Sequence, residues 1–396
     1  MKALFALVVC VFFLYAQTLD DLVNYSLEHH TSLKSLQERL SALENEKSAT
    51  RNFEDPTVAL SVNDIQFDAP TDRTLEAMQS NAITIQQKIP YFGKRDAKTQ
   101  MVISKEKLLQ MNIEQLKSEL KKQIKITAYA LWETRQRIQI VNSYIDVIKE
   151  NISLNEAYNV TADDTQLALM SAKLALSRQK IQKVKFQTLQ NALLAKLAYL
   201  SGQQLSDLQL SLQVTQPQPL NFYVDKVDSS SILHVKSAQV EVQKAQLHIS
   251  ELSSKIDPFI QAGYYYRENH PDYASVTIGA SLPLYGTQKE EQEAQRKQLL
   301  AQEADASDTK NRVGSEVSGL YEQLQEQFQT YTIIKEESLP QIKHLFALQQ
   351  SSLKNGDTLF QYIDILTKKL ALDEELVKAT AKFNQTQAML DALTGE

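Results

Sequence analysis

The sequence predicts a mainly α-helical protein with a small β part, built from a duplicated helix-strand-strand-helix-helix unit. Three observations support this prediction. The 396 residues include nine Gly and nine Pro, and none of either lies between Gly93 and Gly202, which favours long helices. Short segments that alternate between apolar and polar residues precede the long helical patterns. Landmark residues recur at one fixed separation along the chain.

Composition argues against several classes of function. A net charge of −6 and a pI near 5.7 give no reason to expect nucleic-acid binding. The sequence contains no Gly-rich phosphate loop, nucleophile elbow or metal motif, so we expect neither an enzyme nor a cofactor. The adjacent pair His29-His30 lacks a third ligand at a suitable spacing, and we predict no metal site there.

The N-terminus has the pattern of a secretory signal peptide. Residues 1–16 combine one basic residue, a short apolar run and a small residue before a polar chain, which predicts cleavage after Ala16. The alternative is a membrane anchor, but the run is too short to span a bilayer comfortably. Cys10 is preceded by Val9 where a lipoprotein signal has a small residue, which argues against lipidation. The mature chain then has no cysteine, hence no disulfide and no thiolate metal site.

Residues 17–202 form the first predicted repeat. Two short helices separated near His29-His30 end before Glu54-Asp55-Pro56. Strands are predicted at about 57–67 and 82–89, with a polar loop between them. A long helical hairpin then covers 94–201, and its first helix alone would be roughly 90 to 100 Å long.

The second half repeats this order. A linker at 203–228 leads into the second predicted repeat, 229–396. Strands are predicted at about 259–267 and 275–282, followed by a long helical hairpin over 287–395. Three pairs of residues are each separated by 193 positions: Gly93 and Gly286, Asp164 and Asp357, Gly202 and Gly395. An equal separation at a strand end, a hairpin turn and a helix end indicates a duplication.

Each half contains a junction where a strand changes into a helix. The first reads Ile89-Pro90-Tyr91-Phe92-Gly93-Lys94-Arg95 and the second Leu282-Pro283-Leu284-Tyr285-Gly286. Pro cannot donate to a sheet ladder, and Gly relieves the backbone where the chain changes direction. Tyr91, Phe92 and Tyr285 stand where an interfacial aromatic girdle would lie. Lys94 and Arg95 have two interpretations, as cations at a membrane interface or as an ordinary basic helix face.

The four predicted strands carry an apolar face and a small or polar face. On their own they do not make a closed sheet, because their edges would be unpaired. Closure through several subunits solves this problem, and in a secreted bacterial-style protein it gives an outer-membrane barrel with alternating lipid-facing and lumen-facing residues. The other interpretation is a soluble sheet packed on helices, since strands of this length fit both.

On these residues the chain resembles the TolC-type outer-membrane efflux proteins over essentially its whole mature length. Asp55-Pro56, the two junctions and Leu200-Ser201-Gly202 carry the resemblance. It implies a homotrimer in the outer membrane, in which four strands from each of three copies form one 12-stranded β-barrel. A periplasmic α-helical barrel would continue it as a large periplasmic extension.

The resemblance also implies a function and partners. The trimer would be the passive exit duct of a tripartite efflux system, joined to a periplasmic adaptor (a membrane fusion protein) and an inner-membrane pump, commonly a proton-driven transporter. The Pro90 to Arg95 junction is typical of the branch that exports heavy-metal cations. Drug efflux and type I protein secretion are alternatives for the same duct. A periplasmic adaptor is the alternative of another class, although it should carry one hairpin rather than two.

The family closes its periplasmic end with acidic and hydrogen-bonding residues near the hairpin turns. The matching candidates here are Asp364, Asp357 and Asp164. Asp364 lies two residues further from Gly356 than is usual, Thr367 stands where a second acid is common, and Ala168 replaces the acid of the first half. A threefold ring of Asp364 would attract cations and gate the pore. The alternative makes Asp357 and Asp164 helix N-caps and Asp364 a solvated residue.

Overall fold

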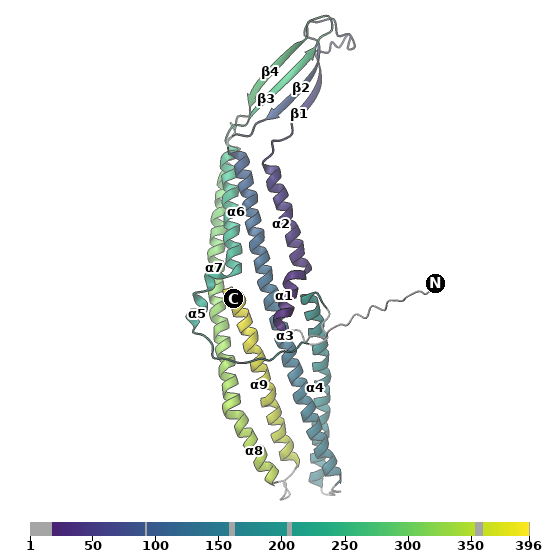
Figure 1. The fold of residues 1–396 in the computed structure, drawn as a ribbon, viewed down its shortest axis with the longest axis vertical. Helices are drawn as coiled ribbons and strands as arrows, with labels where there is room; N and C mark the ends of the chain where they lie inside the picture. Colours follow the sequence, from purple (N-terminus) through teal and green to yellow (C-terminus); the bar gives the residue numbers. More distant parts are fainter. Residues whose placement is uncertain (1–17, 92, 158–162, 204–207, 353–358, 396) are drawn as a thin grey trace, which may run out of the picture. The chain divides into compact units, whose positions relative to one another are not determined.

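The computed structural model describes residues 18–91, 93–157, 163–203, 208–352 and 359–395 (Figure 1). The helices of the first half are α1 (Leu19–His29), α2 (Thr31–Thr50), α3 (Lys94–Ala157) and α4 (Asp163–Ser201). Those of the second half are α5 (Leu220–Val224), the 3-10 turn η1 (Val227–Ser229), α6 (Ser231–Ser253), α7 (Thr287–Ile333), the π-helical segment η2 (Ile334–Ser338), α8 (Leu339–Ser352) and α9 (Leu359–Thr394). The strands are β1 (Thr57–Asn63), β2 (Ser80–Lys88), β3 (Pro258–Tyr266) and β4 (Tyr273–Ala280).

The chain is mainly helical with one small sheet, as the sequence predicts. α3 runs for 64 residues because no Gly or Pro interrupts it. α1 begins with a capping box, in which Thr18 and Asp21 satisfy each other's backbone N–H groups. None of the described helices combines the length and the apolar character that crossing a membrane requires.

The strands depart from the predicted bounds at their ends. β1 stops at Asn63, short of the predicted residue 67, because Asp64 adopts a left-handed conformation (φ 56°) that leaves the ladder. β4 begins at Tyr273 rather than near 275, because Tyr273 already pairs with Tyr265 of β3. The predicted linker 203–228 contains α5 and the start of η1, and the second predicted hairpin contains η2.

The element bounds repeat the separation of the landmark residues. β2 and β4 begin at Ser80 and Tyr273, α3 and α7 at Lys94 and Thr287, and α4 and α9 end at Ser201 and Thr394, each pair 193 residues apart. Gly93, Gly202, Gly286 and Gly395 all adopt positive φ between 74° and 82°. Only glycine takes this conformation without steric cost, which explains its use where strand meets helix and where each hairpin ends.

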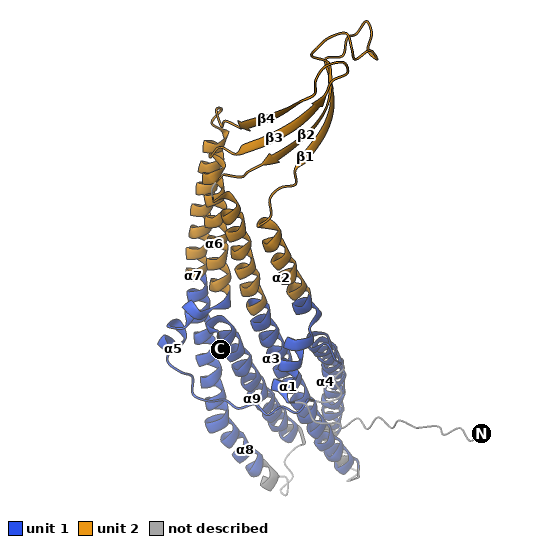
Figure 2. Cartoon of the chain, turned by 45° about the horizontal axis from the view of Figure 1, so that its top comes forward, with its two compact units in different colours: residues 1–34, 115–231, 312–396 blue, residues 35–114, 232–311 orange. Residues whose placement is uncertain are grey.

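The residues divide into two compact units, and each combines segments from both halves of the chain (Figure 2). Unit 1 contains residues 1–34, 115–231 and 312–396, and unit 2 contains residues 35–114 and 232–311. In unit 2, Lys47 of α2 is paired with Glu106 of α3 at 3.0 Å, and Gln243 of α6 bonds Gln295 of α7 at 2.8 Å. These side chains fix the helix pairs that lead into the sheet.

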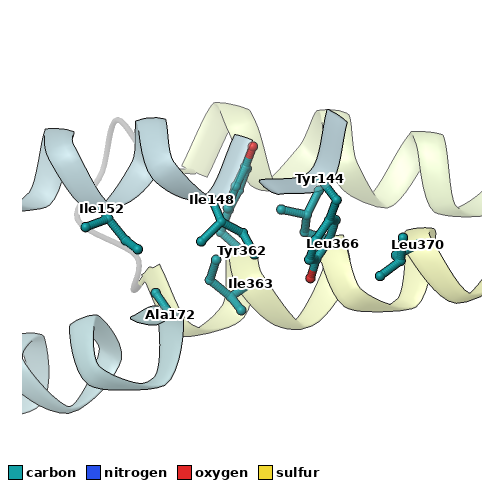
Figure 3. Packing of buried hydrophobic residues seen from close by; sticks show 8 residues of the cluster. All are labelled: Tyr144, Ile148, Ile152, Ala172, Tyr362, Ile363, Leu366 and Leu370. Carbon is teal, nitrogen blue, oxygen red and sulfur yellow. The ribbon is translucent and has the colours of Figure 1, made fainter. Parts of the chain in front are cut away.

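Unit 1 contains an apolar cluster that joins α3, α4 and α9 (Figure 3). Its buried members are Tyr144, Ile148, Ile152, Ala172, Tyr362, Ile363, Leu366 and Leu370. Ile148 and Ala172 are fully buried. We call this set the hairpin cluster, because it holds side chains of the first hairpin against those of the second.

Candidate functional site

The four strands form one antiparallel sheet in the order β1-β2-β3-β4. The central pair, β2 with β3, joins the two halves of the chain. Within unit 2, none of the described helical segments covers either face of the sheet (Figure 2). Within the described residues, β1 and β4 each pair along one side only. An unpaired edge presents a row of free N–H and C=O groups, so each edge of this sheet, β1 and β4, can pair with a further strand.

One face of the sheet is apolar and exposed. The pairs Val58–Ile85, Leu60–Ile83 and Ile260–Ile278 lie directly across from each other on it. The exposed apolar side chains of this face are Val58, Leu60, Val62, Ile83, Ile85, Ile260, Tyr264, Tyr266, Val276 and Ile278. Leu60, Val276 and Ile278 are between 72% and 81% exposed. An apolar surface of this kind requires an apolar environment.

The opposite face carries small and polar side chains. Alternation places Ser61, Thr84, Gln86, Gln261 and Thr277 on it. Three aromatic residues share this face, and two of them lie over glycines. A Cβ added at Gly279 would approach the Phe259 ring to 2.3 Å, and one at Gly263 would approach the Tyr265 ring to 2.8 Å. Tyr265 stacks on Tyr273 with ring centroids 4.5 Å apart.

The first strand-to-helix junction is held by Asp257, which precedes β3. Its carboxylate accepts hydrogen bonds from the Tyr91 backbone N–H and from Lys94 Nζ, both at 2.8 Å. Lys94 Nζ also donates to the Lys255 carbonyl at 2.7 Å, and the backbone N–H of Ile89 donates to the Pro258 carbonyl at 2.8 Å. The junction of the first half is thus fastened to the residues that lead into the second half's strands.

The electrostatics of this junction follow from the same contacts. Burial raises the pKa of Asp257, but the hydrogen bonds from Lys94 and Tyr91 and the charges of Lys94 and Lys98 outweigh it, so the net pKa is lowered. Lys94 is therefore an ion-pair partner of Asp257. Arg95 donates to the Arg51 carbonyl, and its guanidinium lies 4.2 Å from the centroid of the Phe53 ring.

The other predicted junction residues divide between described and undescribed positions. Gly93 accepts the first helical hydrogen bond of α3 from Ala97 at 2.8 Å, and Gly286 does the same for α7 from Lys289 at 2.9 Å. Pro283 lies in a turn closed by the Leu284 N–H and the Leu282 carbonyl. Tyr285 and Tyr91 are exposed, Tyr285 to 95%, and Pro90 is half-buried. Phe92 lies outside the described residues.

Two of the three predicted gate residues lie in the part of the chain that the structure describes. Asp364 is exposed on α9 and forms an ion pair with Lys368 at 2.7 Å, one helical turn away. Asp164 lies in the first turn of α4. Asp357 lies outside the described residues.

A hydrogen bond near Asp364 was not predicted from the sequence. Thr367 Oγ1 donates to the Ile363 carbonyl at 2.7 Å and shares a second hydrogen bond with the Tyr144 hydroxyl at 2.8 Å. Burial raises the pKa of Tyr144, and the hydrogen bond with Thr367, which acts in the opposite direction, does not offset it. This bond ties α3 to α9 beside the hairpin cluster. Only the helical spacing of Tyr144 on an apolar face could have pointed to it.

Comparison with known proteins identifies the fold. No protein-family description matches the sequence, and no curated protein matches it either. Among solved structures, the outer membrane protein VceC of Vibrio cholerae is similar, with a TM-score of 0.78 at 15% identity over 95% of this chain and 96% of that one. The MtrE outer membrane channel of Neisseria gonorrhoeae in its open state gives a TM-score of 0.79 at 12% identity, over 95% and 88%.

A third structure has been described as undergoing conformational changes on folding and transmembrane channel formation. This is CusC, which gives a TM-score of 0.78 at 10% identity, over 95% of this chain and 91% of that one. Structural similarity over nearly the whole chain, at 10% to 15% sequence identity, establishes the fold. The chain therefore has the fold of the TolC-type outer-membrane channels, as the sequence resemblance predicts.

Proposed function

We propose that this protein is an outer-membrane channel, the passive exit duct of a tripartite efflux system. The observation that carries the proposal is the sheet, which has an exposed apolar face, a small or polar face and two open edges. Three copies would close the edges into one 12-stranded barrel with lipid outside and a pore inside. The long helices would continue the pore as a periplasmic α-helical barrel. The similar MtrE structure is an outer membrane channel, which fits a protein without catalytic activity.

Each segment of the chain would have its own role in this channel. Residues 1–16 would direct secretion and be removed, and the duplicated repeats, 17–202 and 229–396, would each supply two strands and one hairpin. The junctions at Pro90, Tyr91, Phe92 and Gly93 and at Pro283, Tyr285 and Gly286 would lie at the membrane interface. A periplasmic adaptor and an inner-membrane pump would dock on the periplasmic part.

Membrane fractionation tests the channel directly. The tagged protein should be found in the outer membrane, should require detergent for extraction and should remain a trimer there. When added to a planar bilayer, it should produce discrete conductance steps. A periplasmic monomer that needs no detergent would overturn the proposal and would favour the adaptor alternative.

The transported species is tested by growth of a deletion strain. The sequence of the first junction favours heavy-metal cations, and the duct would equally serve drug efflux or type I secretion. Copper, silver, cobalt, zinc and cadmium salts should be compared with dyes and detergents. Unchanged metal tolerance with raised sensitivity to dyes and detergents would remove the metal-export assignment.

For the periplasmic gate we retain Asp364 as the candidate that faces solvent, with Asp164 and Asp357 as the further candidates. Its ion pair with Lys368 lowers the net charge that a threefold ring would carry. If the ring forms, Asp364→Asn should weaken the block of conductance by divalent cations added on the periplasmic side, and Lys368→Gln should strengthen it. The same block in both variants would exclude Asp364 from the gate.

A further inference from the structure

The four strands carry a single side chain that is charged at neutral pH. Lys88 is the last residue of β2, and β1, β3 and β4 contain no Asp, Glu, Lys, Arg or His. It pairs with Phe259 of β3. Alternation along β2 therefore puts Lys88 on the small or polar face, together with Gln86 and Thr84. Its side chain is exposed, and none of the ion pairs between described residues involves it.

Cations outnumber anions in the immediate surroundings of Lys88. It lines a cavity of about 300 Å³ whose other charged residues are Glu54, Lys94, Arg95, Lys98 and Asp257. The cavity thus has four cations and two anions. Asp257 is engaged by Lys94 at 2.8 Å, and Glu54 is 4.0 Å from Lys98. Both anions are therefore matched by cations other than Lys88, and the positive charge of Lys88 is left uncompensated at this end of the sheet.

From this placement we propose that Lys88 shifts the charge selectivity of the barrel section toward anions, by opposing the passage of cations at the helix end of the barrel. The inference rests on the proposed function, since it needs three copies arranged around a common pore. Three copies of Lys88 would then form a ring of positive charge on strands that carry no other charged side chain. Rings of Lys or Arg select for anions, and low-dielectric walls focus their field.

Acidic residues at the other end of the sheet do not cancel this effect. The loop that joins β1 to β2 contains Asp64, Asp68, Asp72, Arg73 and Glu76. These residues follow or precede the opposite ends of the strands, about 26 Å from Lys88 along β2 at about 3.3 Å per residue. The Debye length is only about 8 to 10 Å at moderate salt, so the loop charges are screened from Lys88.

The experiment measures ion selectivity of the purified trimer in planar bilayers. The reversal potential in a KCl gradient gives the ratio of chloride to potassium permeability. We expect Lys88→Gln to lower this ratio roughly two- to fivefold and Lys88→Glu to lower it further. Lys88→Arg, which keeps the charge, should leave the ratio unchanged. An unchanged ratio in Lys88→Gln would overturn the proposal.

Moving the charge tests the face as well as the residue. Gln86 lies on the same face as Lys88, and Gln87 lies on the apolar face. In the Lys88→Gln background, Gln86→Lys should restore the ratio and Gln87→Lys should not. Equal restoration by both would contradict the pore-facing position of Lys88. A wild-type protein that gives no conductance at all would instead contradict the proposed function, so the two failures are distinguishable.

Discussion

At the scale of single residues, the two glycines that end the long hairpins give a matched pair. Gly202 and Gly395 both have positive φ, 74° and 78°. A Cβ at Gly202 would meet nothing within 4 Å, whereas one at Gly395 would lie 2.7 Å from the Ser229 carbonyl oxygen.

We therefore expect Gly202→Ala to lower the free energy of unfolding by about 1 to 2 kcal/mol, the cost of a left-handed alanine. Gly395→Ala should cost about 1 to 3 kcal/mol more, because a backbone atom must move. Denaturant unfolding of each variant in detergent measures the difference. Equal losses would show that the Ser229 contact relaxes without cost.

The lowered pKa of Asp257 predicts that the stability contributed by the first junction depends on pH. Its folded pKa is lowered, so its ion pair contributes stability that is present above the unfolded value of 3.8 and is lost as pH falls through the lower folded value. Asp257→Asn should thus reduce the melting temperature at neutral pH. The gap between wild type and variant should stay constant down to about pH 5 and shrink below about pH 4. A gap for Asp257→Asn that persists unchanged near pH 3 would contradict the assignment.

At the scale of elements, we expect arginine substitutions on the two faces of β1 to have opposite outcomes. Leu60 lies on the exposed apolar face and its neighbour Ser61 lies on the small or polar face. An arginine in contact with lipid costs about 2 to 4 kcal/mol at the membrane midplane. Leu60→Arg should therefore sharply reduce the amount of trimer in the outer membrane, and Ser61→Arg should be tolerated. Comparable yields of the two variants would show that this face of the sheet does not contact lipid.

The order of the elements could be predicted from the sequence, but their ends and contacts could not. Alternation, the Asp-Pro and Pro-x-x-Gly signals and the 193-residue separation point to local backbone preferences, which the sequence carries directly. The left-handed Asp64 that ends β1 and the π-helical Ile334–Ser338 have no such signal. The bond between Lys94 and Asp257 joins residues 163 positions apart, so only the pairing of β2 with β3 brings them together.

The candidate gate shows the same limit. A resemblance can place Asp364 on a helix near the hairpin turn, but its partner depends on which helix face it occupies. The structure pairs it with Lys368 on its own helix, while the bond between helices is made by Tyr144 and Thr367. Neutral hydrogen-bonding residues were less conspicuous in the sequence than carboxylates, although here Tyr144 and Thr367 form one of the contacts between the two hairpins, beside the ion pair of Arg137 with Glu374 at 3.1 Å.

At the scale of the whole molecule, the open edges decide how copies must meet. β1 and β4 are different strands, so a contact that pairs them is heterologous: a residue of β1 meets a residue of β4, never its own copy. Such a contact repeats around an axis and closes only at a defined number of copies. Closure at three gives the 12-stranded barrel of the proposal.

Engineered disulfides test this arrangement. Cys10 is the only cysteine, so a Cys10→Ser background has none. Ala59 and Ser275 lie at the same level on the small or polar face, through the pairs Ala59–Thr84, Thr84–Gly263 and Gly263–Ser275. Because barrel closure staggers the strands, Ala59→Cys should be combined in turn with a cysteine at Tyr273, Ser275 or Thr277.

Disulfide geometry tolerates Cβ atoms only about 3.5 to 4.5 Å apart, so we expect one combination to cross-link far better than the others. On a non-reducing gel it should give monomer, dimer and trimer bands and nothing larger, because the third bond closes the ring. The single-cysteine variants should give no dimer, since a heterologous contact never brings identical residues together. Bands beyond the trimer would indicate an open chain of subunits, and a dimer from Ala59→Cys alone would indicate that β1 pairs with its own copy. Either result would replace the closed threefold barrel with a different assembly.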